Sequence, residues 1–91
     1  MYNKLMKELE KIFKAFANRR RLAIIMYLKN KKEATVGDIA AKIKLSFKAT
    51  SKHLGVLAAA DIIEREQRSS QMFYRLSDDQ KPIIKYILSG F

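Results

Sequence analysis

The stretch TVGDIAAKIKLSFKATSKHLGVL, residues 35–57, has the spacing of two short helices joined by a tight turn. Thr35 and Asp38 stand three positions apart, which is the spacing of a capping box and predicts a helix start. The dipeptide at 44–45 makes a short connection, and the hydroxyl of Ser46 can cap a second helix. Two short helices with such a turn between them indicate a helix-turn-helix motif.

The second of these helices has two unlike sides. Its apolar side, at helical spacing, comprises Thr50, Leu54, Leu57 and Ala58. Its opposite side is basic and small, and comprises Lys48, Ser51, Lys52 and Gly55. A helix in the DNA major groove needs side chains that reach phosphates and base edges, and small residues where backbone and groove come close. The pattern therefore predicts a recognition helix, with a solvated face carrying two ordinary lysines as the alternative.

Two helices are predicted before the motif. The first has an apolar stripe opposite a row of lysines, and the stripe comprises Leu5, Leu9, Ile12, Phe13 and Phe16. Asn18 can cap the second helix, over about 19–28, which is apolar around most of its circumference and is therefore placed at the centre of the core. The segment NKKEA at 30–34 is predicted to be a solvated loop.

A hairpin and a last helix are predicted after the motif. IIEREQ at 62–67 and MFYRL at 72–76 favour strands around the polar tip RSSQ. Ser77 and Gln80 have capping-box spacing and predict a helix with an apolar stripe, which comprises Ile83, Ile84, Ile87 and Leu88. The expected fold is mainly α with a small β-hairpin: one winged helix-turn-helix domain over 1–91, with about five helices and a two-stranded wing.

Composition narrows the function. The 91 residues carry 19 Lys and Arg against nine Asp and Glu, a net charge of +10, so the partner is expected to be a polyanion, either nucleic acid or an anionic membrane. The longest apolar run, at 22–28, is too short to span a bilayer, and the first residues lack a signal peptide's apolar block. We therefore expect a cytoplasmic protein. With no Cys and one His, the chain has no disulfide, thiolate metal site or multi-histidine site.

The sequence of the central segment resembles that of a known family. AFANRRRLAII, then TVGDIAAKIKLSFKATSKHLGVLAAADII and a hairpin ending FYRL, resemble the arsenic-repressor (ArsR-type) family of winged-helix transcription regulators over most of residues 12–76. The segment Ser51-Lys52-His53-Leu54 looks like the recognition helix of that family. The resemblance implies that this helix reads the operator major groove, that the wing touches backbone or minor groove, and that the terminal helices form a dimer.

Three departures from the family pattern concern sensing and the wing. Metal sensors of the family carry a cysteine-rich box where this chain has TVGDI, and paired Asp and His on the last helix where it has DDQKPIIKYIL without His. Asp78 and Asp79 are more typical of a helix N-terminus than of metal ligands. The turn into the wing has Ala60-Asp61 in place of the usual glycine. We expect no metal response and no cofactor.

The predicted DNA-contacting set combines the helix face with neighbouring basic and polar residues: Phe47, Lys48, Ser51, Lys52, Gly55, Arg68, Gln71 and Arg20. Arginines at a helix N-terminus oppose the helix dipole, so a phosphate explains Arg20 better than stability does, whereas Arg21 has a carboxylate pair as its alternative. Phe47 has two open roles, a thymine methyl or packing on the preceding helix. Arg68 is interpreted as a phosphate contact, against an ordinary polar turn, and His53 as structural.

The terminal helices carry more apolar surface than a small core needs. The predicted dimer interface comprises Leu5, Leu9, Phe13, Ile84, Ile87 and Leu88. A two-fold interface between them would direct two recognition helices to an inverted-repeat operator. The alternative is that both stripes pack within the monomer.

These features together predict a sequence-specific double-stranded-DNA-binding transcriptional regulator, a homodimeric repressor without a membrane partner, whose inducer the sequence does not identify. A winged helix used for protein contact is the alternative, and it would favour apolar or acidic residues at 48, 51, 52 and 68. An enzyme is not expected, because the chain has no phosphate-binding glycine loop, no Cys and no carboxylate pair with a positioned partner.

Overall fold

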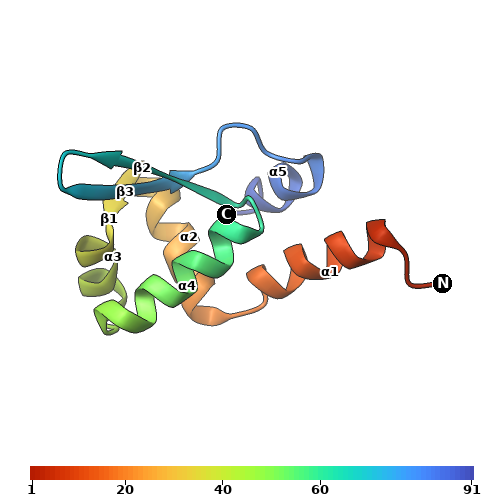
Figure 1. Ribbon diagram of the computed structural model, residues 1–91, viewed down its shortest axis with the longest axis horizontal. Helices are drawn as coiled ribbons and strands as arrows, with labels where there is room; N and C mark the ends of the chain where they lie inside the picture. The colour runs from red at the N-terminus through yellow and green to blue at the C-terminus, as the bar shows by residue number, and fades with distance from the viewer.

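Five helices and three short strands make up the protein, whose computed structural model describes all of residues 1–91 (Figure 1). The elements are α1 (Lys4–Phe16), α2 (Arg19–Lys31), β1 (Glu33–Thr35), α3 (Val36–Ile43), α4 (Phe47–Ala59), β2 (Ile63–Arg68), β3 (Gln71–Leu76) and α5 (Pro82–Leu88). Helices α3 and α4 form the helix-turn-helix, and β2 and β3 form the wing. The winged helix-turn-helix prediction is confirmed.

The sheet has three antiparallel strands in the order β1-β3-β2. The hairpin pairs Ile63 with Leu76 at its base and Arg68 with Gln71 at its tip. The predicted two-stranded hairpin is present, and β1 extends it to a three-stranded sheet. The prediction of a loop at 30–34 is corrected, because α2 continues to Lys31 and Glu33–Thr35 pair with β3. A three-residue strand is too short to show alternation, and only its pairing with β3 makes it a strand.

Side-chain caps start three of the helices as predicted. The Asn18 carboxamide oxygen accepts from the backbone N–H groups of Arg20 and Arg21, at 2.9 and 3.1 Å. Thr35 and Asp38 form the full capping box, in which the side chain of each accepts from the backbone N–H of the other. The Ser46 hydroxyl accepts from the Ala49 N–H at 3.1 Å. These local hydrogen bonds need no tertiary context, which is why sequence spacing reveals them.

The predicted capping box of the last helix is wrong. Helix α5 begins at Pro82, and its N-cap Lys81 makes no side-chain cap. Ser77 still belongs to the wing, because its N–H donates to the Ile62 carbonyl at 3.0 Å, and a proline with its fixed φ suits the first helical turn. Asp78 and Asp79 consequently lie in the loop before α5, outside its first turn.

Leu22 and Met26 of α2 are 39% and 50% exposed, so the expectation that this helix is apolar and buried around most of its circumference is only partly met. The core lies against the other side of α2, which carries Ile24, Ile25 and Leu28. Its fully buried side chains include Ile24, Ile25, Leu28, Ile39, Leu54, Leu57, Ile62 and Ile84. Helix α1 is different, because its first turns project from the body (Figure 1) and only Ile12, Ala15 and Phe16 are buried. None of the helices has the length and apolar character needed to cross a membrane.

Candidate nucleic-acid interface

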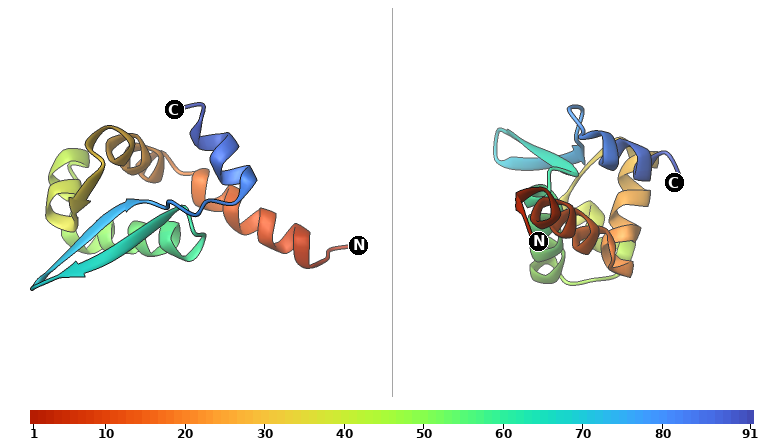
Figure 2. Two further views of the ribbon diagram at one scale, coloured as in Figure 1. Left: turned by 90° about the horizontal axis from the view of Figure 1, so that it is seen from above. Right: turned by 90° about the vertical axis from the view of Figure 1, so that its right-hand side faces the viewer.

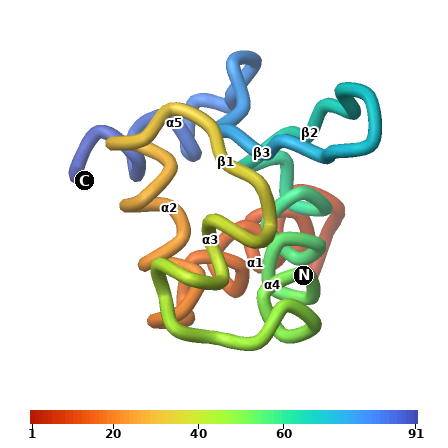
Figure 3. Tube along the Cα trace, turned by 90° about the vertical axis from the view of Figure 1, so that its left-hand side faces the viewer, coloured from red at the N-terminus to blue at the C-terminus, as the bar shows by residue number.

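Helix α4 exposes the basic, small side that its spacing predicts. Thr50, Leu54 and Leu57 are completely buried, and this rotation leaves the other side facing solvent. Lys48, Lys52 and Gly55 are exposed, and Ser51 is partly exposed. The wing hairpin projects on the same side of the molecule as α4 (Figures 2 and 3). The two elements can therefore contact one extended partner.

Gly55 has no internal reason to be glycine. A Cβ added there would meet no atom within 4 Å, and Gly55 does not have a positive φ. Glycine in a helix interior costs roughly 0.5–1 kcal/mol relative to alanine. The residue therefore lowers the stability of α4 without relieving any contact in the protomer, which is expected where an outside surface approaches the backbone.

The tight turns on either side of α4 use left-handed residues. Lys44 ends α3 with a φ of 56°, and the Leu45 N–H donates to the Ala40 carbonyl at 3.0 Å. At the exit, Asp61 has a φ of 61° and the Ile62 N–H donates to the Leu57 carbonyl at 3.1 Å. Aspartate adopts this conformation more readily than most residues. Asp61 therefore makes the turn into the wing, where the resemblance implied a glycine.

Arg21 and His53 tie α4 to the end of α1. The Arg21 guanidinium donates to the carbonyls of Ala15 (2.7 Å) and Lys14 (3.0 Å), and its Nη1 lies 3.2 Å from His53 Nδ1. Because a guanidinium can only donate, Nδ1 accepts and the ring is neutral. Burial, and then the nearby Arg21, Arg20 and Lys52, lower the His53 pKa. The structural role predicted for His53 is confirmed. Arg21 bonds to backbone carbonyls and to His53, so the carboxylate pair left open as its alternative is not formed.

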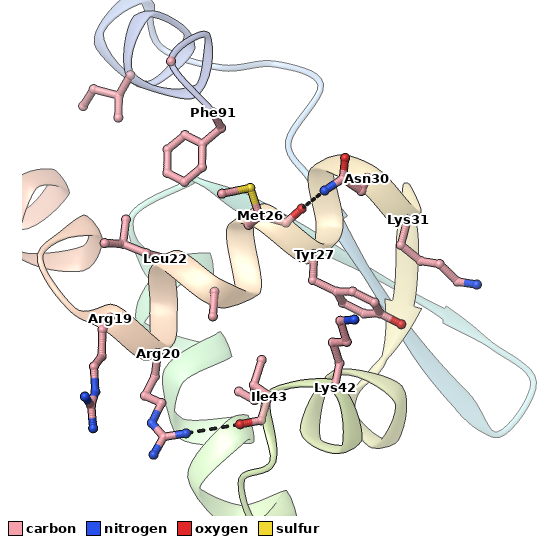
Figure 4. Close-up of a pocket in the computed structure, with 13 residues that line it drawn as sticks. Arg19, Arg20, Leu22, Met26, Tyr27, Asn30, Lys31, Lys42, Ile43 and Phe91 are labelled. Carbon is pink, nitrogen blue, oxygen red and sulfur yellow. Dashed lines mark hydrogen bonds between the residues drawn. The ribbon is translucent and has the colours of Figure 1, made fainter.

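The other two arginines at the start of α2 differ in their surroundings. Arg20 Nη1 donates to the carbonyl of Ile43 at 3.1 Å (Figure 4). This bond holds the last residue of α3 against α2, so Arg20 supports the helix-turn-helix geometry. Arg19 is exposed and forms no ion pair. The guanidinium of Arg19 therefore has no partner within the protein, whereas the sequence pattern selected Arg20 as the DNA contact.

The wing arginines are held in a network of carboxylates. Arg68 donates to both Glu33 oxygens, at 3.1 and 2.6 Å, and to Glu66 at 3.0 Å, and it stacks 4.5 Å from the centre of the Phe73 ring. Arg75 donates to Glu64 and Glu66, each at 2.9 Å. These hydrogen bonds raise the pKa of both arginines and lower that of Glu66. These bonds use three of the five N–H groups of Arg68, so a phosphate would share this guanidinium with Glu33 and Glu66.

Arg65 is the wing cation that the sequence analysis missed. It is exposed, forms no ion pair, and stands opposite Tyr74 across the hairpin. Side chains alternate along a strand, so Glu64, Glu66 and Arg68 share one face and Arg65 lies on the other. Strand alternation in EREQR could have separated Arg65 from the carboxylates. Gln71, at the tip, is exposed as predicted.

The predicted dimer residues divide between exposed and buried positions. On α1, Leu5 and Phe13 are 63% and 48% exposed, and Leu9 is partly buried. On α5, Ile84 and Leu88 are buried inside the protomer, so their assignment to a dimer interface is wrong. The reason is that α5 packs on α2, where the Lys29 ammonium donates to the Leu88 carbonyl at 2.6 Å.

Only part of the α5 surface remains for a partner. Ile87 is half-buried and Tyr86 is largely exposed. The surplus of apolar surface is therefore mainly on α1. Lys81 pairs with Glu8 of α1 and, at 3.8 Å, with Asp61 after α4, so one exposed lysine connects the segment before α5 to both helices.

Comparisons with known proteins agree with this geometry. Residues 18–65, more than half of the chain, match the family model described as "Bacterial regulatory protein, arsR family". The chain is 33% identical over 69 residues to the transcriptional activator HlyU of Vibrio cholerae serotype O1, covering 76% of this chain and 63% of HlyU. It is 28% identical over 78 residues to the arsenical resistance operon repressor of Bacillus subtilis, covering 86% of this chain and 74% of that protein.

A solved structure extends the likeness to the whole fold. The crystal structure of NolR from Sinorhizobium fredii matches with a TM-score of 0.78 and 31% identity, covering 92% of this chain and 80% of NolR. The family model spans both helices of the motif and the start of the wing. The chain belongs to the ArsR family of bacterial regulatory proteins.

Proposed function

We propose that this chain is a sequence-specific double-stranded-DNA-binding transcriptional regulator that acts as a homodimer and represses by occupying an inverted-repeat operator. The observation that carries the proposal is the basic, small-residue side of α4, which is exposed while the opposite side is completely buried. The proposal includes a cytoplasmic location and no catalytic activity.

The α4 side has the groups that a major groove requires. Lys48 and Lys52 form no ion pair within the protomer, so their charges are available to phosphates or guanine acceptors. The partly exposed Ser51 can hydrogen-bond either bases or phosphates, and Gly55 lets the backbone come close. Phe47, at the first turn, is largely exposed rather than packed on α3, which favours the thymine-methyl role.

A homodimer supplies a cover for α1 and a second recognition helix. Two copies related by a two-fold axis would bury the apolar residues of α1 and direct both α4 helices to the same face of DNA. Half-sites would then lie about 34 Å apart, one helical turn, or a multiple of this. The printed names of the relatives include an activator and a repressor, so a reporter assay has to measure the sign of regulation.

The proposal includes insensitivity to metal. Metal sensing would need thiolates or paired histidines, and the chain has no Cys and one His. No group of three or more His, Cys, Asp or Glu side chains lies close enough to hold an ion. Zinc or cadmium is therefore expected to leave operator affinity unchanged.

Selection of bound fragments from the source genome at physiological salt tests the proposal. We expect recovery of an inverted repeat, bound by the wild-type chain and lost with Lys48→Glu plus Lys52→Glu. Lys85→Glu plus Lys11→Glu, at two exposed lysines on α5 and α1, is the control of equal charge change. Recovery of fragments without a shared sequence, or equal binding by the double variant, would contradict the proposal.

A further inference from the structure

An open groove of 1120 Å³ runs along the exposed side of α2. The end of α3 forms one wall, and the residues at and after the end of α5 form the other (Figure 4). None of the predicted DNA-reading residues of α4 lines it. The groove therefore lies outside the helix face and the wing described above.

The floor of the groove is apolar. Leu22 and Met26 of α2 are 39% and 50% exposed there, and Ile43 and Phe91 line its two walls. The Phe91 ring packs against the buried Phe16 with a centroid distance of 6.5 Å, which fixes this wall on the body of the protein. From Leu22 to Asn30, at 1.5 Å per residue, the floor is about 12 Å long.

The rim of the groove is cationic. Arg19 and Arg20 line one end and Lys31 and Lys42 the other, and no acidic residue lines the groove. None of the four forms an ion pair. Arg20 already donates to Ile43, whereas both lysines are free and lie at the same end as the Tyr27 hydroxyl, a further hydrogen-bond donor (Figure 4).

This combination favours one class of occupant. A second copy of α1 would bring an apolar stripe, but its lysines at 4, 7, 11 and 14 outnumber its two glutamates and would meet the cationic rim. DNA would satisfy the rim but would leave the apolar floor in water. A molecule with a hydrocarbon body and one carboxylate matches both features.

We propose that the groove binds an amphipathic carboxylic acid, with its carboxylate between Lys31, Lys42 and the Tyr27 hydroxyl and its hydrocarbon body over Leu22, Met26 and Phe91. A linear acid of about twelve carbons has the length of the floor. Each methylene removed from the ligand should weaken binding about fourfold if it is buried. The site touches the end of α3, where Ile43 holds Arg20, so occupancy would alter the support of the helix-turn-helix.

Calorimetric titration of the full chain with dodecanoate, below micelle formation, tests binding directly. We expect one saturable site, with dodecyltrimethylammonium showing no binding and dodecanol binding at least tenfold more weakly. Met26→Glu should weaken dodecanoate binding more than tenfold, and Lys42→Ala about threefold. Lys85→Ala and Lys11→Ala are the matched controls, because both lysines are exposed outside the groove, and they should leave the affinity unchanged.

Several outcomes would overturn the site. These are an absence of saturable binding, equal binding of the cationic amphiphile, or equal affinity of Met26→Glu and wild type with both folded by circular dichroism. Ultracentrifugation adds another: if Met26→Glu or Lys42→Ala dissociates a wild-type dimer, the groove is a subunit interface and the proposal fails.

A DNA arm tests the regulatory consequence, which rests on the proposed function. Saturating dodecanoate should lower operator affinity of the wild type at least threefold and leave Met26→Glu unaffected. Unchanged operator affinity at saturation would overturn the effector role. Calorimetry needs no DNA, so failure of operator binding and failure of the groove give different results.

Discussion

The recognition helix and the wing carry similar cations in opposite states. Lys48 and Lys52 on α4 are exposed and form no ion pair, whereas Arg68 and Arg75 of the wing each donate to two carboxylates. Both regions read as basic in the sequence. Within these two regions, both lysines of α4 are unpaired, whereas Arg65 is the one wing arginine outside the carboxylate network. The net charge of the chain does not reveal this distribution.

Local geometry explains the difference. Helix α4 contains no acidic residue, so its lysines have no partner three or four positions away. In the hairpin, the alternation of a strand gathers Glu64, Glu66 and Arg68 on one face, and antiparallel pairing sets Arg75 opposite Glu64. Strand β1 then adds Glu33, which lies opposite Arg75 of β3 and accepts from Arg68. The charges of the wing thus pair with one another, whereas the lysines of α4 remain unpaired.

The largest expected loss of operator affinity comes from substituting the unpaired lysines of α4. Lys48→Glu or Lys52→Glu should each cost about 1–3 kcal/mol of specific binding if the residue reads a base, and both together should abolish operator binding. The fold should remain, because both lie opposite the buried stripe. Gel-shift titration with a circular-dichroism melt measures both properties. A folded double variant that keeps its operator affinity would refute the recognition-helix assignment.

The next largest effect is expected from disrupting the dimer, because a monomer would bring only one recognition helix to the operator. Phe13→Glu places a charge on the exposed stripe of α1 and should convert a dimer at micromolar concentration into monomer. Affinity for a full inverted repeat should then fall towards that for a single half-site. Analytical ultracentrifugation and titration of full and half operators measure the two effects. A wild-type chain that is already monomeric would remove both the dimer and the palindrome.

Gly55 separates stability from recognition on the same helix. Gly55→Ala should raise the free energy of unfolding by about 0.5–1 kcal/mol, since the new methyl group meets no neighbour. It should also weaken operator binding several-fold, because the backbone no longer approaches the groove closely. Denaturant unfolding and operator titration test this opposition. Unchanged operator affinity would show that no close approach occurs at this position.

Arg65 and Arg68, on opposite faces of the wing, are expected to have smaller effects on DNA affinity. Arg65→Ala should weaken binding to all DNA sequences alike and reduce the slope of log affinity against log salt by about one, as expected for a lost phosphate contact. Arg68→Ala should change the slope less, because Glu33 and Glu66 already hold that cation. A larger slope change for Arg68→Ala would mean that DNA displaces the carboxylates.

The smallest effect concerns acid stability and again distinguishes the regions. The pKa of His53 is lowered from 6.5 in the folded state, so the unfolded chain takes up the proton first and stability falls as the pH drops below 6.5. The pKa of Glu66 is lowered from 4.5, first by Arg68 and then by Arg75, so its contribution is complete above pH 4.5 and is lost below it.

Unfolding curves across pH can assign the two steps. His53→Gln should remove the decline that begins below pH 6.5, and Glu66→Gln should reduce the one below pH 4.5. If His53→Gln leaves the first decline intact, another group is responsible for it. The helix and the wing would then not lose stability at the different pH values that their hydrogen bonds indicate.

Local sequence by itself determined the helices, three of their caps, the hairpin and the face of α4 that is exposed. Those features depend on 3.6-residue periodicity, on side chains that bond to backbone within a few positions, and on strand-favouring runs around a polar tip. Thr35, Asp38 and Ser46 illustrate this, since each acts within its own turn. The resemblance to the ArsR family rested on residues 12–76, which include these three positions.

Tertiary structure alone decided which polar and apolar groups remain free. Glu33 and Arg68 are 35 positions apart and meet only because β1 pairs with β3, and Ile84 is buried only because α5 packs on α2. The same packing places Phe91 beside α2 and creates the groove. A pattern along the chain shows which side of an element is apolar, but partners distant in sequence determine whether that side, or a charge beside it, is already occupied.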